Sequence, residues 1–438
     1  MSLNLATGLL LQLLAVAMVL FRTRGRWLAH AGVLFVLVSS VYYGWWELVQ
    51  IMFPGRNFYR TLVYQEDIDA WILIVSIALF LFAIVYCATL RNVRKPSYDA
   101  AKLSEWARCH FPGWRLLLLV ALPGFWITIS GRDFGYWINN LSAYFTNFAL
   151  LTASTAFILR SGPRFVLPVM LIQALLFVLI GARSAVVLNS IVLLSILVRF
   201  GVAIRWRQMM ALGVVGVVLM MLISAARVVS GRFDTETTGG SGRVEWLKAG
   251  LSVLTDPATL KGAVADDFIY RFDGNAFNGM VCRELGNGCR PAGFQSFRNN
   301  VRLMVPSFAN PRKLDNDVAD LFEEDYTVAH YGLPEGIDYL VGTLGIIYSY
   351  HGAWGLWCIV IFMGWFYAMI DNWLAGSRTT WAFCMGLGFI TTSLLVESAI
   401  QGYFGTFRSL MVFYFFVQVL LWIQRYWRKG LSKNKAAL

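Results

Sequence analysis

Long apolar runs dominate the chain and are separated by short polar stretches. Each run is apolar along its whole length. Most runs are close to the length, about 17–25 residues, that an α-helix needs to cross a hydrocarbon core. Continuous runs favour helices over the alternating strands of a membrane β-barrel. The pattern therefore predicts an all-α polytopic membrane protein with about 11 transmembrane helices. They are expected at 3–21, 28–46, 70–90, 116–131, 137–159, 165–181, 184–198, 208–226, 353–373, 380–397 and 409–424.

The polar stretches alternate in charge along the chain. Every second one is basic: "RTRGR", "RNVRKPSYDAAKLSEWARCHFPGWR", "RSGPR", "RFGVAIRWR", "DNWLAGSR" and the tail "RYWRKGLSKNK". Because Lys and Arg gather in cytoplasmic loops, these stretches are predicted inside, with the N-terminus outside and the C-terminus cytoplasmic. The first run is expected to remain as a helix, because Arg22, Arg24 and Arg26 follow its apolar core, whereas a signal peptide carries its charges before the core.

One connection is much longer than the others. The chain is expected to comprise eight transmembrane helices in 1–226, a large outer loop in 227–340, and three helices with a basic tail in 341–438. A connection of that length is expected to contain folded elements. Two amphipathic helices are predicted in the loop, in "GRVEWLKAGLSVL" and in "DDFIYRFDGNAFNGMVCREL", with irregular chain after them.

Composition agrees with a membrane protein. Hydrophobic residues make up 58% of the chain and charged residues 14%, against about 45–50% and about 25% in soluble proteins. The formal net charge of +12 would suggest nucleic acid in a soluble protein. Here the basic inner loops account for the charge, and no nucleic-acid-binding motif accompanies it. Membrane lipids are therefore the expected partners of these loops, and nucleic acid is not.

Two of the six cysteines lie in the long outer loop. Cys282 and Cys289 bracket "RELGNG", whose Gly-Asn-Gly sequence favours a turn that would bring the sulfurs together. Disulfides persist outside the cytoplasm, so a Cys282–Cys289 disulfide is predicted, with two free thiols as the alternative. A zinc site is not expected, because no third or fourth Cys or His stands nearby.

Several arginines lie where apolar runs meet the predicted outer surface. They are Arg183, Arg227, Arg232 and Arg408. The planar guanidinium binds phosphate through two parallel hydrogen bonds and stays charged when partly desolvated. A group of arginines at this depth would suit a lipid-linked pyrophosphate, whose phosphates lie where the apolar tail ends. The alternative is that each arginine reaches the phosphates of ordinary membrane lipids.

Candidate acid–base groups are few on the outer side. His330 precedes the point where the chain returns to the membrane, and Glu335 and Asp338 follow it closely. A general base for a hydroxyl nucleophile needs a histidine or carboxylate at such a position. The alternative for His330 is a surface histidine that is only hydrogen-bonded. No Asp-x-Asp pair or histidine cluster faces outward, so neither a metal nor another cofactor is expected.

Three stretches together resemble the bacterial O-antigen polymerase family and the related O-antigen ligases. "GARSAVVL" is similar to the arginine-bearing segment that opens a middle helix in that family. "YRFDGN" followed by "RLMVPSFANPRKLDND" resembles the family's arginine-rich periplasmic loop. "GLPEGIDYLVGTLGIIYSYHGAWGL" resembles the family's return into the membrane. The resemblance covers residues 180–375, and elsewhere only the number of spans agrees.

The resemblance implies a glycosyltransferase of GT-C-like architecture in the bacterial inner membrane, with a periplasmic N-terminus and large loop. It implies metal-independent transfer of a glycan from undecaprenyl pyrophosphate to the non-reducing end of a lipid-linked repeat unit. Its partners would be this polyprenyl-pyrophosphate-linked oligosaccharide and, as a further candidate, a chain-length regulator. The residues that would hold pyrophosphate are Arg183, Arg227, Arg271 and Arg312.

The resemblance also implies a catalytic base. Ligases place a histidine near the end of the large loop, and His330 is the matching position. The next residue is Tyr331, where a ligase has asparagine, so Glu335 is retained as a second candidate for the base. This departure from the ligase pattern leaves the choice between the two bases open.

Other functions remain open from the sequence. An O-antigen ligase would use the same chemistry with a lipid A-core acceptor. A polyprenyl-phosphate sugar transferase would carry an acidic motif in its first outer loop, for which "YQEDIDAW" is a candidate. A lipid-linked glycan flippase or other transporter would show internal repeats and charges within its spans; no repeat is evident and such charges are scarce. A non-catalytic assembly factor is the remaining alternative.

Overall fold

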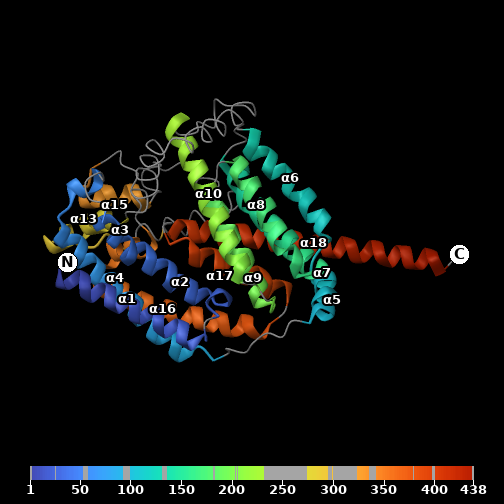
Figure 1. The fold of residues 1–438 in the computed structure, drawn as a ribbon, viewed down its shortest axis with the longest axis horizontal. Helices are drawn as coiled ribbons and strands as arrows, with labels where there is room; N and C mark the ends of the chain where they lie inside the picture. The colour runs from blue at the N-terminus through green and yellow to red at the C-terminus, as the bar shows by residue number, and fades with distance from the viewer. Residues whose placement is uncertain are drawn as a thin grey trace. The chain divides into compact units, whose positions relative to one another are not determined.

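The computed structural model of the chain is helical throughout the part that it describes (Figure 1). That part comprises residues 2–24, 26–52, 58–91, 99–130, 136–180, 183–202, 206–230, 274–293, 323–334, 342–377, 379–396 and 400–436, with residues 204 and 298. The α-helices are α1 (Leu3–Arg22), α2 (Ala31–Ser40), α3 (Trp46–Met52), α4 (Gln65–Thr89), α5 (Ala100–His110), α6 (Trp114–Ser130), α7 (Tyr136–Ser161), α8 (Val166–Ile180), α9 (Arg183–Arg199), α10 (Trp206–Ser230), α13 (Gly274–Gly286), α15 (Glu323–Tyr331), α16 (Thr343–Gly376), α17 (Thr380–Leu394) and α18 (Ile400–Ala436). Short 3₁₀ turns lie at Trp27–Ala29, Phe58–Leu62 and Pro163–Phe165.

Each predicted apolar run lies mainly on helix within the described residues, although some helices, such as α16 and α18, extend well beyond the expected boundaries. Among the described residues, five helices are long and apolar enough to cross a membrane, and a bent pair formed by α5 and α6 makes a sixth candidate. Four of the remaining runs correspond to shorter apolar helices, namely parts of α8, α9, α10 and α17. The structure therefore supports an all-α, membrane-spanning protein, with five or six of the expected eleven spans meeting this test.

The chain divides into two compact units that do not follow its linear order. Unit 1 comprises Met1–Val93, Ala265–Gly376 and Phe389–Thr406. Unit 2 comprises Arg94–Val264, Ser377–Gly388 and Phe407–Leu438. The division predicted from the sequence, with boundaries at residues 226 and 340, follows the order of segments along the chain. The compact units cross those boundaries, because part of the long loop folds into unit 1.

Unit 1 is a bundle of α1, α2–α3, α4 and α16. At one end Ser2, which caps α1, donates to Asp69 near the start of α4. At the other end the Arg22 guanidinium donates to the carbonyl oxygen of Cys87, near the end of α4. The two helices therefore run parallel, side by side (Figure 1). This is the relation that the predicted alternation of spans requires.

The buried Asp371 carboxylate fixes the directions of the other two helices of the bundle. It lies near the end of α16 and accepts hydrogen bonds from the first N–H groups of α2, those of Ala31 and Gly32, both at 3.1 Å. The Tyr86 hydroxyl, near the end of α4, donates to the same carboxylate at 2.8 Å. Helix α2 therefore starts where α4 and α16 end, so it runs antiparallel to them.

Small residues let these helices approach closely. A Cβ on Gly32 would lie 2.2 Å from the Tyr86 ring, and a Cβ on Gly44 would lie 1.9 Å from the Gln12 side-chain oxygen. Close approach of this kind is typical of helix pairs in membranes, where van der Waals packing drives association. Gly44 lies in a π-helical turn, Val41–Trp45, that joins α2 to α3 within one candidate membrane span, Ala31–Met52.

Helix α16 is broken at Gly352, whose φ of 63° and ψ of −170° are not helical. The residues before the break, Thr343–Tyr350, are all buried within unit 1. The residues after the break form the long apolar segment, which agrees with the prediction that this span begins at residue 353. Glycine adopts a positive φ without the steric cost that a side chain brings, so it suits this position.

In unit 2, the ends of α5, α7 and α17 meet. Arg160 in the last turn of α7 donates to the carbonyl oxygens of Ala107 and Phe111 at the end of α5, at 2.8 and 3.2 Å. His110 Nδ1 lies 3.2 Å from the Thr380 hydroxyl at the start of α17. All three helix ends lie in or next to stretches predicted inside, so their proximity is consistent with that topology.

Candidate functional site

Part of the predicted outer loop is embedded in unit 1. Helix α13 lies within the second amphipathic helix expected in that loop, and every residue of Gly274–Val281 is buried. The earlier residues of that expected helix, and the whole of "GRVEWLKAGLSVL", lie outside the described residues. A loop helix that is buried along most of its length must satisfy its polar side chains internally.

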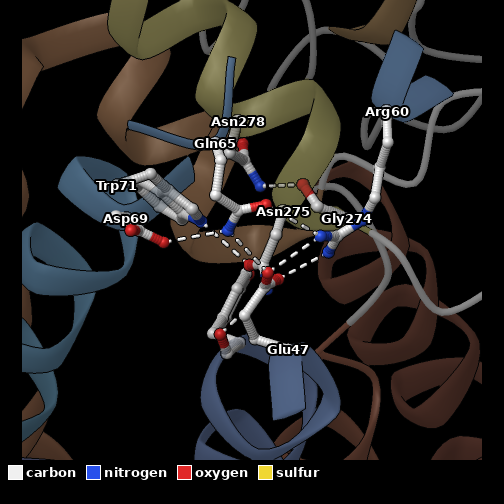
Figure 2. Close-up of polar contacts among 9 residues, drawn as sticks. Glu47, Arg60, Gln65, Asp69, Trp71, Gly274, Asn275 and Asn278 are labelled. Carbon is white, nitrogen blue, oxygen red and sulfur yellow. Dashed lines mark hydrogen bonds and ion pairs between the residues drawn. The ribbon is translucent and has the colours of Figure 1, made fainter. Parts of the chain in front are cut away.

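Alongside its packing on α4, α13 is joined to the bundle through a buried ion pair and its hydrogen bonds (Figure 2). The side chain of Glu47 on α3 has no exposed surface. Its carboxylate accepts hydrogen bonds from both terminal nitrogens of Arg60, at 2.8 and 2.5 Å. Arg60 lies in the 3₁₀ turn Phe58–Leu62 and its side chain is 18% exposed. A two-pronged pair of this kind is the strong form of an arginine–carboxylate contact.

Asn275 joins α13 to this pair. Its side-chain nitrogen donates to the Tyr43 carbonyl oxygen at 2.9 Å and to Glu47 at 3.3 Å. Its side-chain oxygen accepts the indole N–H of Trp71 at 3.2 Å. One buried amide therefore links α13 to three elements of the bundle: the π-helical turn, α3 and α4. Figure 2 shows these contacts converging between α13 and the bundle.

Gln65 extends the network to Asp69. The Gln65 amide nitrogen donates to Glu47 at 3.0 Å and to Asp69 at 2.9 Å, and Ser2 donates to the other Asp69 oxygen. Asp69 is the last carboxylate of "YQEDIDAW" and is buried. Both Asp69 oxygens therefore accept hydrogen bonds within unit 1, and the carboxylate joins α4 to the start of α1.

The predicted base His330 lies in the last turn of α15, on the exposed surface of unit 1. Its Nε2 lies 2.8 Å from the Arg290 carbonyl oxygen. A carbonyl oxygen can only accept, so Nε2 carries a proton and, in the neutral ring, Nδ1 has the free lone pair. The ring is also in contact with two tyrosines: Tyr326 stacks on it, and Tyr331 meets it edge to face at 4.8 Å. His330 is thus an oriented imidazole with one nitrogen able to accept a proton.

The predicted disulfide is not formed in the structure, where Cys282 and Cys289 are both free thiols. The Gly-Asn-Gly turn is present and ends α13, with Gly288 at a φ of 96°. It leaves Cys282 on the helix, largely buried against Tyr348, and Cys289 exposed beyond it. Burial raises the pKa of the Cys282 thiol. The turn therefore separates the environments of the two sulfurs, contrary to the expected pairing.

Two of the four predicted pyrophosphate ligands lie on helices of unit 2. Arg183 opens α9, and Arg227 lies in the last turn of α10. These helices pack together and are joined by the short connection 200–205, so they form an antiparallel pair. The start of α9 and the end of α10 therefore lie at the same end of that pair. Arg271, Arg312 and Glu335 lie outside the described residues.

The residues that hold α13 in place were not predicted from the sequence. Glu47 occurs in the apolar context "YYGWWELVQIM", and a carboxylate there requires a cation or several hydrogen bonds. That signal could have identified Glu47 as a buried ionic partner. Its partners, however, are Arg60, Gln65 and the distant Asn275, and only the folded chain identifies them. Helix α15 was also not expected.

Comparisons with known proteins identify no relative. No protein family, no curated protein and no solved structure matches this chain. Within the described residues, no group of three or more His, Cys, Asp or Glu side chains is arranged so that it could hold a metal ion.

Proposed function

We propose that this chain is a glycosyltransferase of the O-antigen polymerase type in the bacterial inner membrane. It transfers a glycan from undecaprenyl pyrophosphate to the non-reducing end of a lipid-linked repeat unit at the periplasmic face, without a metal ion. The observation that carries the proposal is the oriented His330 imidazole at the end of unit 1 predicted to face outward, since a hydroxyl nucleophile needs such a base.

In the proposed mechanism, the unprotonated Nδ1 of His330 accepts the proton of the acceptor hydroxyl. The hydroxyl oxygen attacks the anomeric carbon of the donor glycan, and the bond between that carbon and the pyrophosphate oxygen breaks. Undecaprenyl pyrophosphate leaves with the bonding electron pair. Arg183, Arg227, Arg271 and Arg312 stabilise the negative charge that grows on it, which is the largest catalytic contribution in many enzymes. The placement of Arg183 and Arg227 at one end of a helix pair supports this role.

The proposal also includes the topology: eleven spans, a periplasmic N-terminus and large loop, and a cytoplasmic C-terminus. The parallel and antiparallel relations of α1, α2, α4 and α16 support that alternation in unit 1. The exclusion of nucleic acid as a partner, and the chain-length regulator as a further partner, rest on the sequence alone.

The test is the glycan ladder of a strain that lacks the endogenous gene and carries this chain. His330→Ala and Arg183→Ala are each expected to reduce the ladder to a single repeat unit on the lipid core. The matched control is Arg207→Ala, since Arg207 is exposed in the first turn of α10, at the opposite end of the same helix pair. A full ladder with either variant, at normal expression, contradicts the role proposed for that residue.

An O-antigen ligase is the second candidate, because the ligases' histidine corresponds to His330. The same experiment separates the two functions. If the chain is a ligase, the variants are expected to lose all surface glycan while long polymers accumulate on the polyprenyl carrier.

A further inference from the structure

Breaking α16 at Gly352 leaves carbonyl groups without helical partners. The last turn before the break includes Ser349 and Tyr350, whose carbonyl oxygens would otherwise accept from residues four positions later. Buried carbonyl groups require other donors. Both residues are buried, so the donors must come from elsewhere in the chain.

The segment after α13 supplies two of these donors. The backbone N–H of Ala292 donates to the Ser349 carbonyl oxygen, and that of Gly293 donates to the Tyr350 carbonyl oxygen, both at 3.0 Å. These two successive bonds hold the segment around residue 292 along the broken end of the helix. Arg290, whose carbonyl oxygen accepts the hydrogen bond from His330, lies just before these two residues.

Tyr331 supplies a third donor and joins α15 to the same point. Its hydroxyl donates to the Ser349 carbonyl oxygen at 2.5 Å, so this oxygen accepts two hydrogen bonds. Only 5% of Tyr331 is exposed, and burial raises the pKa of its hydroxyl, which therefore stays protonated across the physiological range. Helix α15 ends at this residue, and Gly332 follows with a φ of 62°.

We infer that Tyr331 is a positioning residue that sets the orientation of the His330 imidazole through the Ser349 carbonyl group. The Tyr331 hydroxyl binds the Ser349 carbonyl oxygen and so fixes the end of α15, where His330 lies. The same oxygen binds the N–H of Ala292 and so fixes the segment that contains the Arg290 carbonyl group. The donor and the acceptor of the His330 hydrogen bond therefore share one anchor. Misplacement of a reacting group by about 1 Å can lower a rate by roughly a hundredfold. This inference rests on the proposed function, in which His330 is the base.

The test uses Tyr331→Phe, which removes the hydroxyl and keeps the ring that contacts His330. In a transfer assay with lipid-linked repeat units and purified protein, kcat is expected to fall about tenfold to a hundredfold with KM nearly unchanged. Tyr426→Phe is the matched control, because Tyr426 is 69% exposed on α18, and it should retain the full rate. A wild-type kcat for Tyr331→Phe overturns the inference.

A double-mutant cycle separates positioning from general stability. If Tyr331 acts through His330, adding Tyr331→Phe to His330→Ala should not lower the residual rate further. An additional loss of similar size in the double variant would show a structural role and overturn the inference. Activity retained by His330→Ala alone would instead contradict the base in the proposed function, so the two failures are distinguishable.

Discussion

At the residue scale, the buried polar side chains of unit 1 show how a charge is tolerated in an apolar bundle. An isolated carboxylate within protein is very costly, whereas one with a paired cation and further hydrogen bonds is stable. Glu47 receives four donors, two from Arg60 and one each from Gln65 and Asn275. The ion pair therefore holds α3, the turn Phe58–Leu62 and α13 together.

Removing the Glu47 carboxylate is expected to destabilise the protein strongly. Glu47→Ala leaves the Arg60 guanidinium and the Asn275 amide without their acceptor, and loss of one partner from a buried pair costs about 3–5 kcal/mol. Thermal unfolding of the purified protein in detergent measures the effect. Glu66→Ala is the control, since Glu66 is exposed in the first turn of α4, and it should change stability by less than about 0.5 kcal/mol.

The double variant supplies a second readout of the same pair. Adding Arg60→Ala to Glu47→Ala removes the unpaired guanidinium and should cause less further loss than Arg60→Ala causes alone. Strictly additive losses would contradict a direct coupling between the two side chains.

At the element scale, α13 is a segment of the long loop that packs closely on the bundle within the described residues. Asn278, fully buried on α13, lies against Gly345 in the first part of α16, where a Cβ would be 2.0 Å from the Asn278 side-chain oxygen. Gly279 of the same helix packs on Ile68 and Val63. The helix thus contacts the bundle on two faces, which explains its burial despite its place in a largely polar loop.

Gly345→Ala is expected to loosen this contact. The added methyl group must displace Asn278 or move α13, and overpacking of this kind typically costs about 1–3 kcal/mol. The midpoint of thermal unfolding should therefore fall. Gly376→Ala is the matched control at the end of the same helix, where a Cβ meets no atom within 4 Å, and it should leave the midpoint unchanged or slightly raised. Equal midpoints for both variants would contradict the close packing of α13 on α16.

At the scale of the whole molecule, two native cysteines report the proposed topology. Cys289, just after α13, and Cys109, in α5, are both exposed thiols and are predicted on opposite sides of the membrane. A membrane-impermeant maleimide applied to spheroplasts should modify Cys289 and should reach Cys109 only after permeabilisation. Cys289→Ser and Cys109→Ser variants identify the labelled sites.

The reverse labelling pattern would invert the proposed orientation. Labelling of Cys289 only after reduction would show instead that the Cys282–Cys289 disulfide forms in the cell. Both outcomes are read from the same gel, so topology and redox state are tested together.

The elements of this protein were largely predictable from local sequence, since hydrophobic runs and glycine turns act over a few residues. The runs at 3–21 and 70–90 became α1 and α4, and the span expected from 353 begins just after the break at Gly352. The choice of His330 as a base, from its place before the return to the membrane, stays a prediction. Its hydrogen bond to Arg290 was not predicted, because the partner lies 40 residues away in an irregular segment.

The sequence by itself determined that the protein is all-α and membrane-spanning, because hydrophobicity and helical hydrogen bonding are local properties that each segment satisfies alone. Only the tertiary structure decided that α13 is buried, that Glu47 pairs with Arg60, and that Ser349 anchors both sides of the His330 contact. These outcomes depend on hydrogen bonds between distant segments, such as that between Asn275 and Tyr43, 232 residues apart. Such bonds form wherever folding brings a buried donor to a buried acceptor, and no local pattern specifies that meeting.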